Sequence, residues 1–111
     1  MSRRSADTDV YTAIGHPVRR SILDYLSEGE APVLRIAKLF PGITGPALSQ
    51  HLKVLREVGL VVETRQGRLR VYRLNPVLLQ QVWGWVSQYE RFWQEKLGTL
   101  GEFLKKKRKR I

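Results

Sequence analysis

Three polar or basic side chains share one face of a predicted helix. Within the segment Ala47–Glu57, three leucines recur at helical spacing and form an apolar stripe: Leu48, Leu52 and Leu55. At 100° per residue, Ser49, Gln50 and Lys53 lie on the other side of this helix. Gln50 can pair bidentately with adenine, Ser49 offers a donor and an acceptor, and Lys53 suits a phosphate or a guanine. The pattern predicts a helix that reads the major groove of double-stranded DNA.

Thr44, Pro46 and His51 extend this candidate DNA-binding surface. Thr44 is a favourable N-cap for the helix, and Pro46 lies on the outward side of the first turn. Gly59 is typical of the position just after a helix end. His51 lies at the border of the leucine stripe with no Cys and no second His within helical reach. We therefore expect a structural His, or one that bonds the DNA backbone, rather than a metal ligand.

A predicted β-hairpin carrying arginines follows the helix directly. The segments Leu60–Thr64 and Leu69–Leu74 are rich in β-branched and aromatic residues, and their apolar pattern has a period of about two. Gly67 supplies the positive φ that a tight turn between two strands needs. Four arginines lie at the tip of this two-stranded hairpin or on its return strand: Arg65, Arg68, Arg70 and Arg73. We expect the first three to contact the DNA backbone or the neighbouring minor groove.

Two short helices are predicted near the start of the chain. The first covers Val10–Ile14, has Asp7 or Asp9 as its N-cap and breaks at the following glycine. Pro17 opens the second, where its missing N–H costs nothing. The segment 28–30, Glu-Gly-Glu, ends it.

A third short helix is expected at about Val33–Phe40, before the DNA-reading helix. Its inward side chains are expected to be Leu34 or Val33, Ala37 and Phe40. The predicted architecture is α+β and mainly α: four helices, two strands and a last helix. A short helix, a turn, a second helix with a polar outer face and a basic hairpin follow the order of a winged helix-turn-helix.

The last helix is predicted from about Val77 to Leu104. An apolar stripe recurs along it at steps of three and four residues: Leu79, Val82, Val86, Tyr89, Trp93, Leu97, Leu100 and Leu104. A flanking row consists of Leu78, Trp85 and Phe92. A helix of roughly 28 residues spans about 40 Å, more than so small a core covers. We therefore expect a homodimer held by the terminal helices, with residues 1–104 as one DNA-binding and dimerisation domain.

The aromatic residues of this last helix admit a second interpretation. Five of them gather in one stretch: Trp83, Trp85, Tyr89, Phe92 and Trp93. Packing in the core or the dimer interface is expected, and a pocket for an aromatic or lipid-like effector is the alternative. The polar side of the helix is mixed in charge, which argues against a membrane-surface helix.

The charge of the chain points to an anionic partner. Twenty Lys and Arg against ten acidic residues give a net charge of +10 in 111 residues. Six of the cations lie together at Lys105–Arg110, and the rest of the chain carries +4. We expect residues 105–111 to be a disordered, solvated tail. The alternative is a non-specific architectural DNA-binding protein that uses this tail.

Composition excludes several other classes of function. The absence of Cys excludes disulfides and thiolate metal sites and suits a cytoplasmic protein. We find no signal peptide, no membrane span, no phosphate-binding loop and no nucleophile motif, and expect neither an enzyme nor a cofactor. His16 precedes a proline and is expected to be an N-cap rather than a metal ligand.

Three stretches resemble the ArsR/SmtB-type winged-helix repressors. The stretch His16–Leu23 resembles their early motif, and Thr44–Leu55 followed by Gly59–Val61 resembles their recognition helix and first strand. Gly67 and Arg68, with Tyr72 and Leu74, are similar to their wing. The resemblance covers about residues 10–104. It implies a dimer that occupies an imperfectly palindromic operator and blocks transcription, in many members until a ligand releases it.

Two departures from the family pattern qualify this resemblance. Metal-sensing members carry two thiols near the third helix, and the aligned positions here are Pro32 and Leu34. Other members bind zinc through Asp and His pairs on the first and last helices, and the last helix here contains no His. We therefore expect neither the thiolate site nor this zinc site. Gly45 stands where many relatives have a polar side chain, so one expected base contact is missing. No residue pattern points to a particular small-molecule effector.

Overall fold

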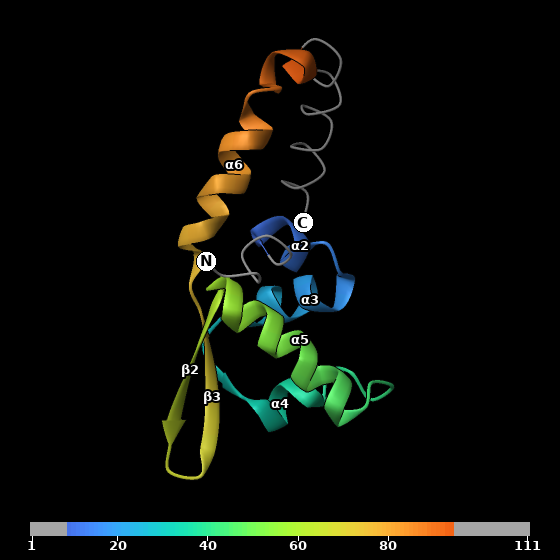
Figure 1. The fold of residues 1–111 in the computed structure, drawn as a ribbon, viewed down its shortest axis with the longest axis vertical. Coiled ribbons are helices and arrows are strands. Elements are labelled where there is room, and N and C mark those ends of the chain that lie inside the picture. Colours follow the sequence, from blue (N-terminus) through green and yellow to red (C-terminus); the bar gives the residue numbers. More distant parts are fainter. Residues whose placement is uncertain (1–8, 95–111) are drawn as a thin grey trace, which may run out of the picture. The chain divides into compact units, whose positions relative to one another are not determined.

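The computed structural model describes residues 9–94, and the chain divides after Gln80 into two compact units. The first unit contains these helices and strands: α2 (Val10–Ile14), α3 (Pro17–Leu26), β1 (Ala31–Pro32), α4 (Val33–Ala37), α5 (Gly45–Val58), β2 (Val61–Gln66) and β3 (Leu69–Leu74) (Figure 1). A 3₁₀ turn, η1 (Pro76–Leu78), then leads into α6 (Leu79–Ser87). Apart from β1, this order of elements is the predicted one.

The first two helices begin at the residues that the sequence indicates. Asp9 is the N-cap of α2, where its Oδ1 accepts a hydrogen bond from the Thr12 amide at 2.9 Å. This hydrogen bond lowers the pKa of Asp9 below its usual value. His16 caps α3, since its Nδ1 accepts from the Val18 amide at 3.1 Å, and Pro17 occupies the first turn. The N-cap prediction for His16 is confirmed.

Helix α5 is capped at both ends. At its start, Oγ1 of Thr44 accepts from the Ala47 amide at 3.2 Å. At its end, Gly59 adopts φ 97°, a left-handed conformation that favours glycine. The Leu60 amide donates to the Leu55 carbonyl at 3.0 Å, which closes a Schellman motif and turns the chain into β2. Both predicted caps are confirmed.

The hairpin is part of a three-stranded antiparallel sheet with the order β1-β3-β2. The predicted pairing of β2 with β3 is confirmed, and Gly67, with φ 65°, lies in a two-residue turn. The prediction of a two-stranded sheet was incomplete, because Ala31 and Pro32 pair with Tyr72 and Val71. Only two residues form β1 and one is a proline, so no strand pattern marks it.

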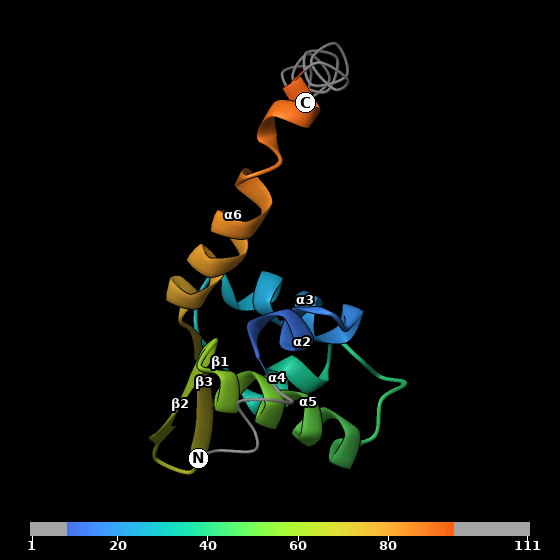
Figure 2. The ribbon, with the colours of Figure 1, turned by 45° about the horizontal axis from the view of Figure 1, so that its top comes forward.

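The core of the first unit lies beneath α5. The predicted leucine stripe is confirmed, since Leu48, Leu52 and Leu55 are all buried. Helix α5 packs against α2, α3 and β2, and α4 packs against β1 and β3. Figures 1 and 2 show the loop from α4 to α5 at one end of α5 and the hairpin at the other.

The prediction left Leu34 or Val33 open on the inward face of α4, and the structure selects Val33. The prediction was incomplete because it missed Ile36. Leu34 is 71% exposed, whereas Ile36, which the pattern did not select, is fully buried. Val33, Ala37 and Phe40 are half-buried. The helix has only five residues, so its apolar spacing was too short to define a face.

The prediction of one unbroken helix from Val77 to Leu104 was wrong. Helix α6 ends at Ser87, a turn follows at residues 88–89, and residues 90–94 are helical again. Oγ of Ser87 donates to the Gly84 carbonyl at 3.1 Å, and Nε2 of Gln88 donates to the Trp85 carbonyl at 2.9 Å. These are the carbonyls that a continuing α-helix would use for its next two amides, so side chains compete with the backbone at this point.

Part of the predicted stripe and the whole basic tail lie outside the described residues. These are Leu97, Leu100 and Leu104 of the stripe, and Lys105–Arg110 of the tail. Within residues 9–94, no helix is long and apolar enough to cross a membrane.

Candidate nucleic-acid interface

The outer face of α5 is free of covering side chains from its own unit. Thr44, Pro46, Ser49, Gln50 and Lys53 are all exposed, whereas the leucines on the opposite side are buried. One α-helix of this kind fits the major groove, which is about 12 Å wide. The cap at Thr44 and the leucine anchors hold this face in a defined orientation. The structure brings five of the predicted site residues together on α5 and its N-cap.

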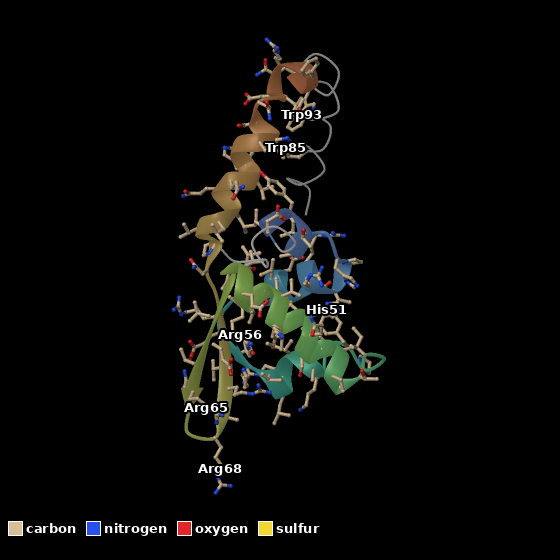
Figure 3. All side chains as sticks on the ribbon, in the orientation of Figure 1. His51, Arg56, Arg65, Arg68, Trp85 and Trp93 are labelled. Atoms are coloured by element: carbon tan, nitrogen blue, oxygen red, sulfur yellow. The ribbon has the colours of Figure 1, made fainter. Side chains whose placement is uncertain are left out.

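The hairpin presents three of the predicted arginines. Arg65, Arg68 and Arg70 are exposed, and Figure 3 shows Arg68 extending from the tip of the hairpin. Arg65 lies within β2 opposite Arg70 of β3, rather than in the turn as expected. Side chains alternate along strands, so these two share one face of the hairpin while Arg73 lies on the other.

A polar network joins α5 to the hairpin. Nη1 of Arg56, in the last turn of α5, lies 3.1 Å from Oε1 of Glu63 and 3.4 Å from the Tyr72 hydroxyl. Nη1 of Arg70 lies 4.0 Å from the other oxygen of Glu63. Burial, followed by the nearby charge of Glu63, raises the pKa of Tyr72. The network connects the last turn of α5 to the hairpin.

Sequence reasoning missed Arg56 and Glu63. They are seven positions apart, on a helix and on the strand that follows it, and nothing in their spacing indicates contact. A basic residue in the last turn of a helix is also explained by the helix dipole alone. Figure 3 shows Arg56 where α5 meets the hairpin.

His51 differs from the other predicted site residues because it is partly buried and has partners within its own unit. Nη1 of Arg19 lies 3.0 Å from its Nδ1, and the centroids of the His16 and His51 rings are 4.4 Å apart. Burial, then the charges of His16 and Arg19, lower the pKa of His51 below its ordinary value of 6.5. Sequence reasoning gave Arg19 no role, because this contact joins residues 32 positions apart.

The described residues offer no donor set for a metal ion. In residues 9–94, no group of three His, Cys, Asp or Glu side chains lies close enough together to hold one. Pro32 and Leu34, at the positions where metal-sensing relatives carry thiols, supply no ligand atoms in their side chains.

Comparisons with known proteins bear on this geometry. A family described as a helix-turn-helix domain matches residues 14–64. The chain is 35% identical over 81 residues to the transcriptional repressor SdpR of Bacillus subtilis, covering 73% of this chain and 89% of that protein. It is 34% identical over 97 residues to the HTH-type transcriptional regulator Rv2034 of Mycobacterium tuberculosis, with 87% of each chain covered. A solved ArsR family transcriptional regulator is 28% identical with a TM-score of 0.68, covering 76% of this chain and 86% of that chain.

The fold, with a bare polar helix face beside an arginine-bearing hairpin, defines a winged helix-turn-helix transcriptional regulator. The chain belongs to the ArsR family of these regulators. The resemblance found in the sequence is thereby confirmed. The family consists of regulators of transcription and not of enzymes.

Proposed function

We propose that this ArsR-family regulator is a homodimeric repressor that binds double-stranded DNA at an imperfectly palindromic operator. The observation that carries the proposal is the exposed side of α5, where Ser49, Gln50 and Lys53 lie opposite a buried leucine stripe. Repression is supported by the relative SdpR, which is named a transcriptional repressor.

In the proposed complex, α5 enters the major groove. Ser49 and Gln50 read base edges, and Lys53 contacts a phosphate or a guanine. Thr44 and Pro46 lie at the start of the helix, close to the DNA backbone. His51 donates to a backbone phosphate through its ring nitrogen that does not contact Arg19.

The hairpin serves as the wing in this complex. Arg68 at the tip reaches into the neighbouring minor groove, where the negative potential is deepest. Arg65 and Arg70 share the hairpin face that carries Glu63 and Tyr72, and they contact the flanking backbone. Because Glu63 holds Arg70 loosely at 4.0 Å, that arginine is free to turn toward a phosphate.

The second unit supports the proposed homodimer. Within the described residues, none of the side chains of α6 is buried. Large aromatic side chains are exposed there, among them Trp83 at 68%, and Figure 3 shows Trp85 and Trp93 on this unit. A second copy of the chain is the simplest cover for such an apolar surface. Two-fold symmetry then places the DNA half-sites about 34–36 Å apart, or a multiple of that distance.

Selection of bound duplexes from a random or genomic pool tests this function. The expected result is one enriched palindrome whose binding persists as salt rises. Binding without any enriched sequence, and lost entirely at higher salt, would contradict the proposal.

Three alanine variants then test which side chains contact the DNA. Lys53→Ala and Arg68→Ala should each weaken binding of the selected duplex by about 1–3 kcal/mol without unfolding the protein. Arg73→Ala is the matched control, because it removes the same charge from the other face of the same hairpin. Equal effects of all three variants would mean that only net charge matters.

A further inference from the structure

Arg19 joins three elements of the first unit. It lies in α3, and its Nε donates to the Ala13 carbonyl of α2 at 2.7 Å while Nη2 donates to the Thr12 carbonyl at 3.1 Å. Its third contact, from Nη1 to Nδ1 of His51 at 3.0 Å, reaches α5. The Thr12 carbonyl also accepts from the Gly15 amide at 3.1 Å, so Arg19 adds a second hydrogen bond there, binds the Ala13 carbonyl and contacts α5 with the same guanidinium.

The neighbouring arginine makes a simpler contact. Nη1 of Arg20 donates to the Ile14 carbonyl of α2 at 2.8 Å. Both arginines therefore bind the C-terminal end of α2, but the described contacts connect only Arg19 with α5. A substitution of Arg20 is thus a control, because it disturbs the end of α2 without removing a contact to α5.

The contact with Arg19 fixes the protonation of His51. A guanidinium only donates, so Nδ1 of His51 must accept and the ring proton lies on Nε2. His51 is directly adjacent to Gln50 in α5 and two residues before Lys53. Displacement of the His51 side chain from Arg19 would therefore remove one of the contacts that orient the part of α5 proposed to read bases.

We infer that Arg19 is a positioning residue for DNA recognition, which locks α5 to the end of α2 through neutral His51 and releases it when His51 is protonated. This inference rests on the proposed function. A protonated imidazole donates from both nitrogens and cannot accept from Arg19, and the two cations then repel each other.

The charged groups around His51 favour the neutral ring. His16, just before α3, and Arg19 both disfavour a positive charge on it, and α2 contributes carbonyls that Arg19 already occupies. Strand β2 packs against α5 as well, but its Glu63 pairs with Arg56 in the last turn.

The direction of the pH effect follows from the lowered pKa of His51. The folded protein favours the neutral ring, so the lock contributes its full stability above the ordinary pKa of about 6.5. This contribution is lost as the pH falls through the lowered pKa. A simple extra charge on His51 would instead strengthen binding of every duplex at low pH.

The test compares affinity for the selected duplex with affinity for a scrambled duplex, at about pH 7.5 and at the lowest pH at which the wild type remains folded. The ratio of the two affinities should fall about tenfold for the wild type on acidification, which is the effect of losing one charge-assisted hydrogen bond. Arg19→Lys should have the low ratio at both pH values, because a single ammonium nitrogen cannot occupy the three positions from which Nε, Nη1 and Nη2 donate. Arg20→Lys should behave as the wild type.

Two further variants distinguish the role of His51 from that of His16. His51→Asn keeps an acceptor for Arg19 but does not titrate, so its ratio should be the same at both pH values whatever its absolute affinity. His16→Asn keeps an N-cap for α3 and should retain the pH dependence. A wild-type ratio and pH profile in Arg19→Lys, or an unchanged pH dependence in His51→Asn, would overturn the inference.

The free protein gives a reading that does not depend on DNA. The thermal midpoint of the wild type should fall between the two pH values by more than that of His51→Asn. Equal falls would overturn the lock even if DNA recognition is established. If the wild type prefers no duplex, the proposed function fails, and this thermal comparison alone decides whether the contact acts as a lock.

Discussion

Glycine-to-alanine substitutions at the two ends of α5 should have opposite effects on stability. Gly59 follows the helix with φ 97° and takes part in the Schellman motif, whereas Gly45 is the first helical residue and has no positive φ. A Cβ at Gly59 would meet Cδ1 of Leu78 at 3.4 Å, an ordinary contact, and a Cβ at Gly45 would meet nothing within 4 Å. Any destabilisation at Gly59 therefore comes from the backbone conformation and not from crowding.

The magnitudes follow from these conformations. A residue with a Cβ in the left-handed region costs about 1–2 kcal/mol, so Gly59→Ala should lower the free energy of unfolding by that amount. Gly45→Ala should raise the free energy of unfolding by about 0.4–1 kcal/mol. Alanine has fewer conformations than glycine in the unfolded chain, and it adopts the helical conformation of this position without strain. For a domain of this size, 1 kcal/mol corresponds to a thermal midpoint shift of about 4–8 °C.

Thermal unfolding followed by far-UV circular dichroism measures both variants. Protein concentrations must be matched, since the midpoint of the proposed dimer would depend on concentration. Equal stability of Gly59→Ala and the wild type, or a loss in Gly45→Ala as large as that in Gly59→Ala, would refute the assignment of the two caps.

Three further predictions concern the core, the second unit and the tail. Leu52→Ala should destabilise the protein by about 2–5 kcal/mol, whereas Leu34→Ala, on the exposed side of α4, should change stability by less than about 0.5 kcal/mol in denaturant titrations. Trp83→Ala should weaken self-association in sedimentation experiments, because Trp83 is a large apolar side chain exposed on α6, whereas Gln80→Ala on the same helix should leave it unchanged; equal self-association of the two variants would contradict the proposed dimer surface. Deletion of Lys105–Arg110 should lower affinity for all duplexes and leave the sequence preference intact, and a lost preference would count against recognition by α5.

Local signals allowed much of the first unit to be predicted from the sequence. The caps at Asp9, His16, Thr44 and Gly59 and the leucine stripe of α5 each depend on residues within one turn or one helix. The exposed face of α5 follows from that stripe, so most candidate site residues could be found without coordinates. The hairpin was equally readable, because Gly67 separates two alternating runs.

What the sequence did not reveal depends on contacts between distant residues. Strand β1 exists only because β3 lies beside it, and the orientation of α4 is set by the sheet rather than by its five residues. Arg19 and Arg56 hold α5 through partners on other elements, and no spacing rule predicts such pairs. The break after Ser87 arises from side chains that take the carbonyls of the preceding turn, an outcome that apolar periodicity does not register.

Protection of a single thiol on α5 tests the central claim most directly. The chain contains no Cys, so Ser49→Cys introduces the only thiol, and Glu28→Cys places one on an exposed turn after α3 as a control. Saturation with the selected duplex should abolish alkylation of the thiol introduced by Ser49→Cys and leave that introduced by Glu28→Cys unchanged. Undiminished alkylation in Ser49→Cys, with the duplex demonstrably bound, would contradict the assignment of α5 as the DNA-reading helix.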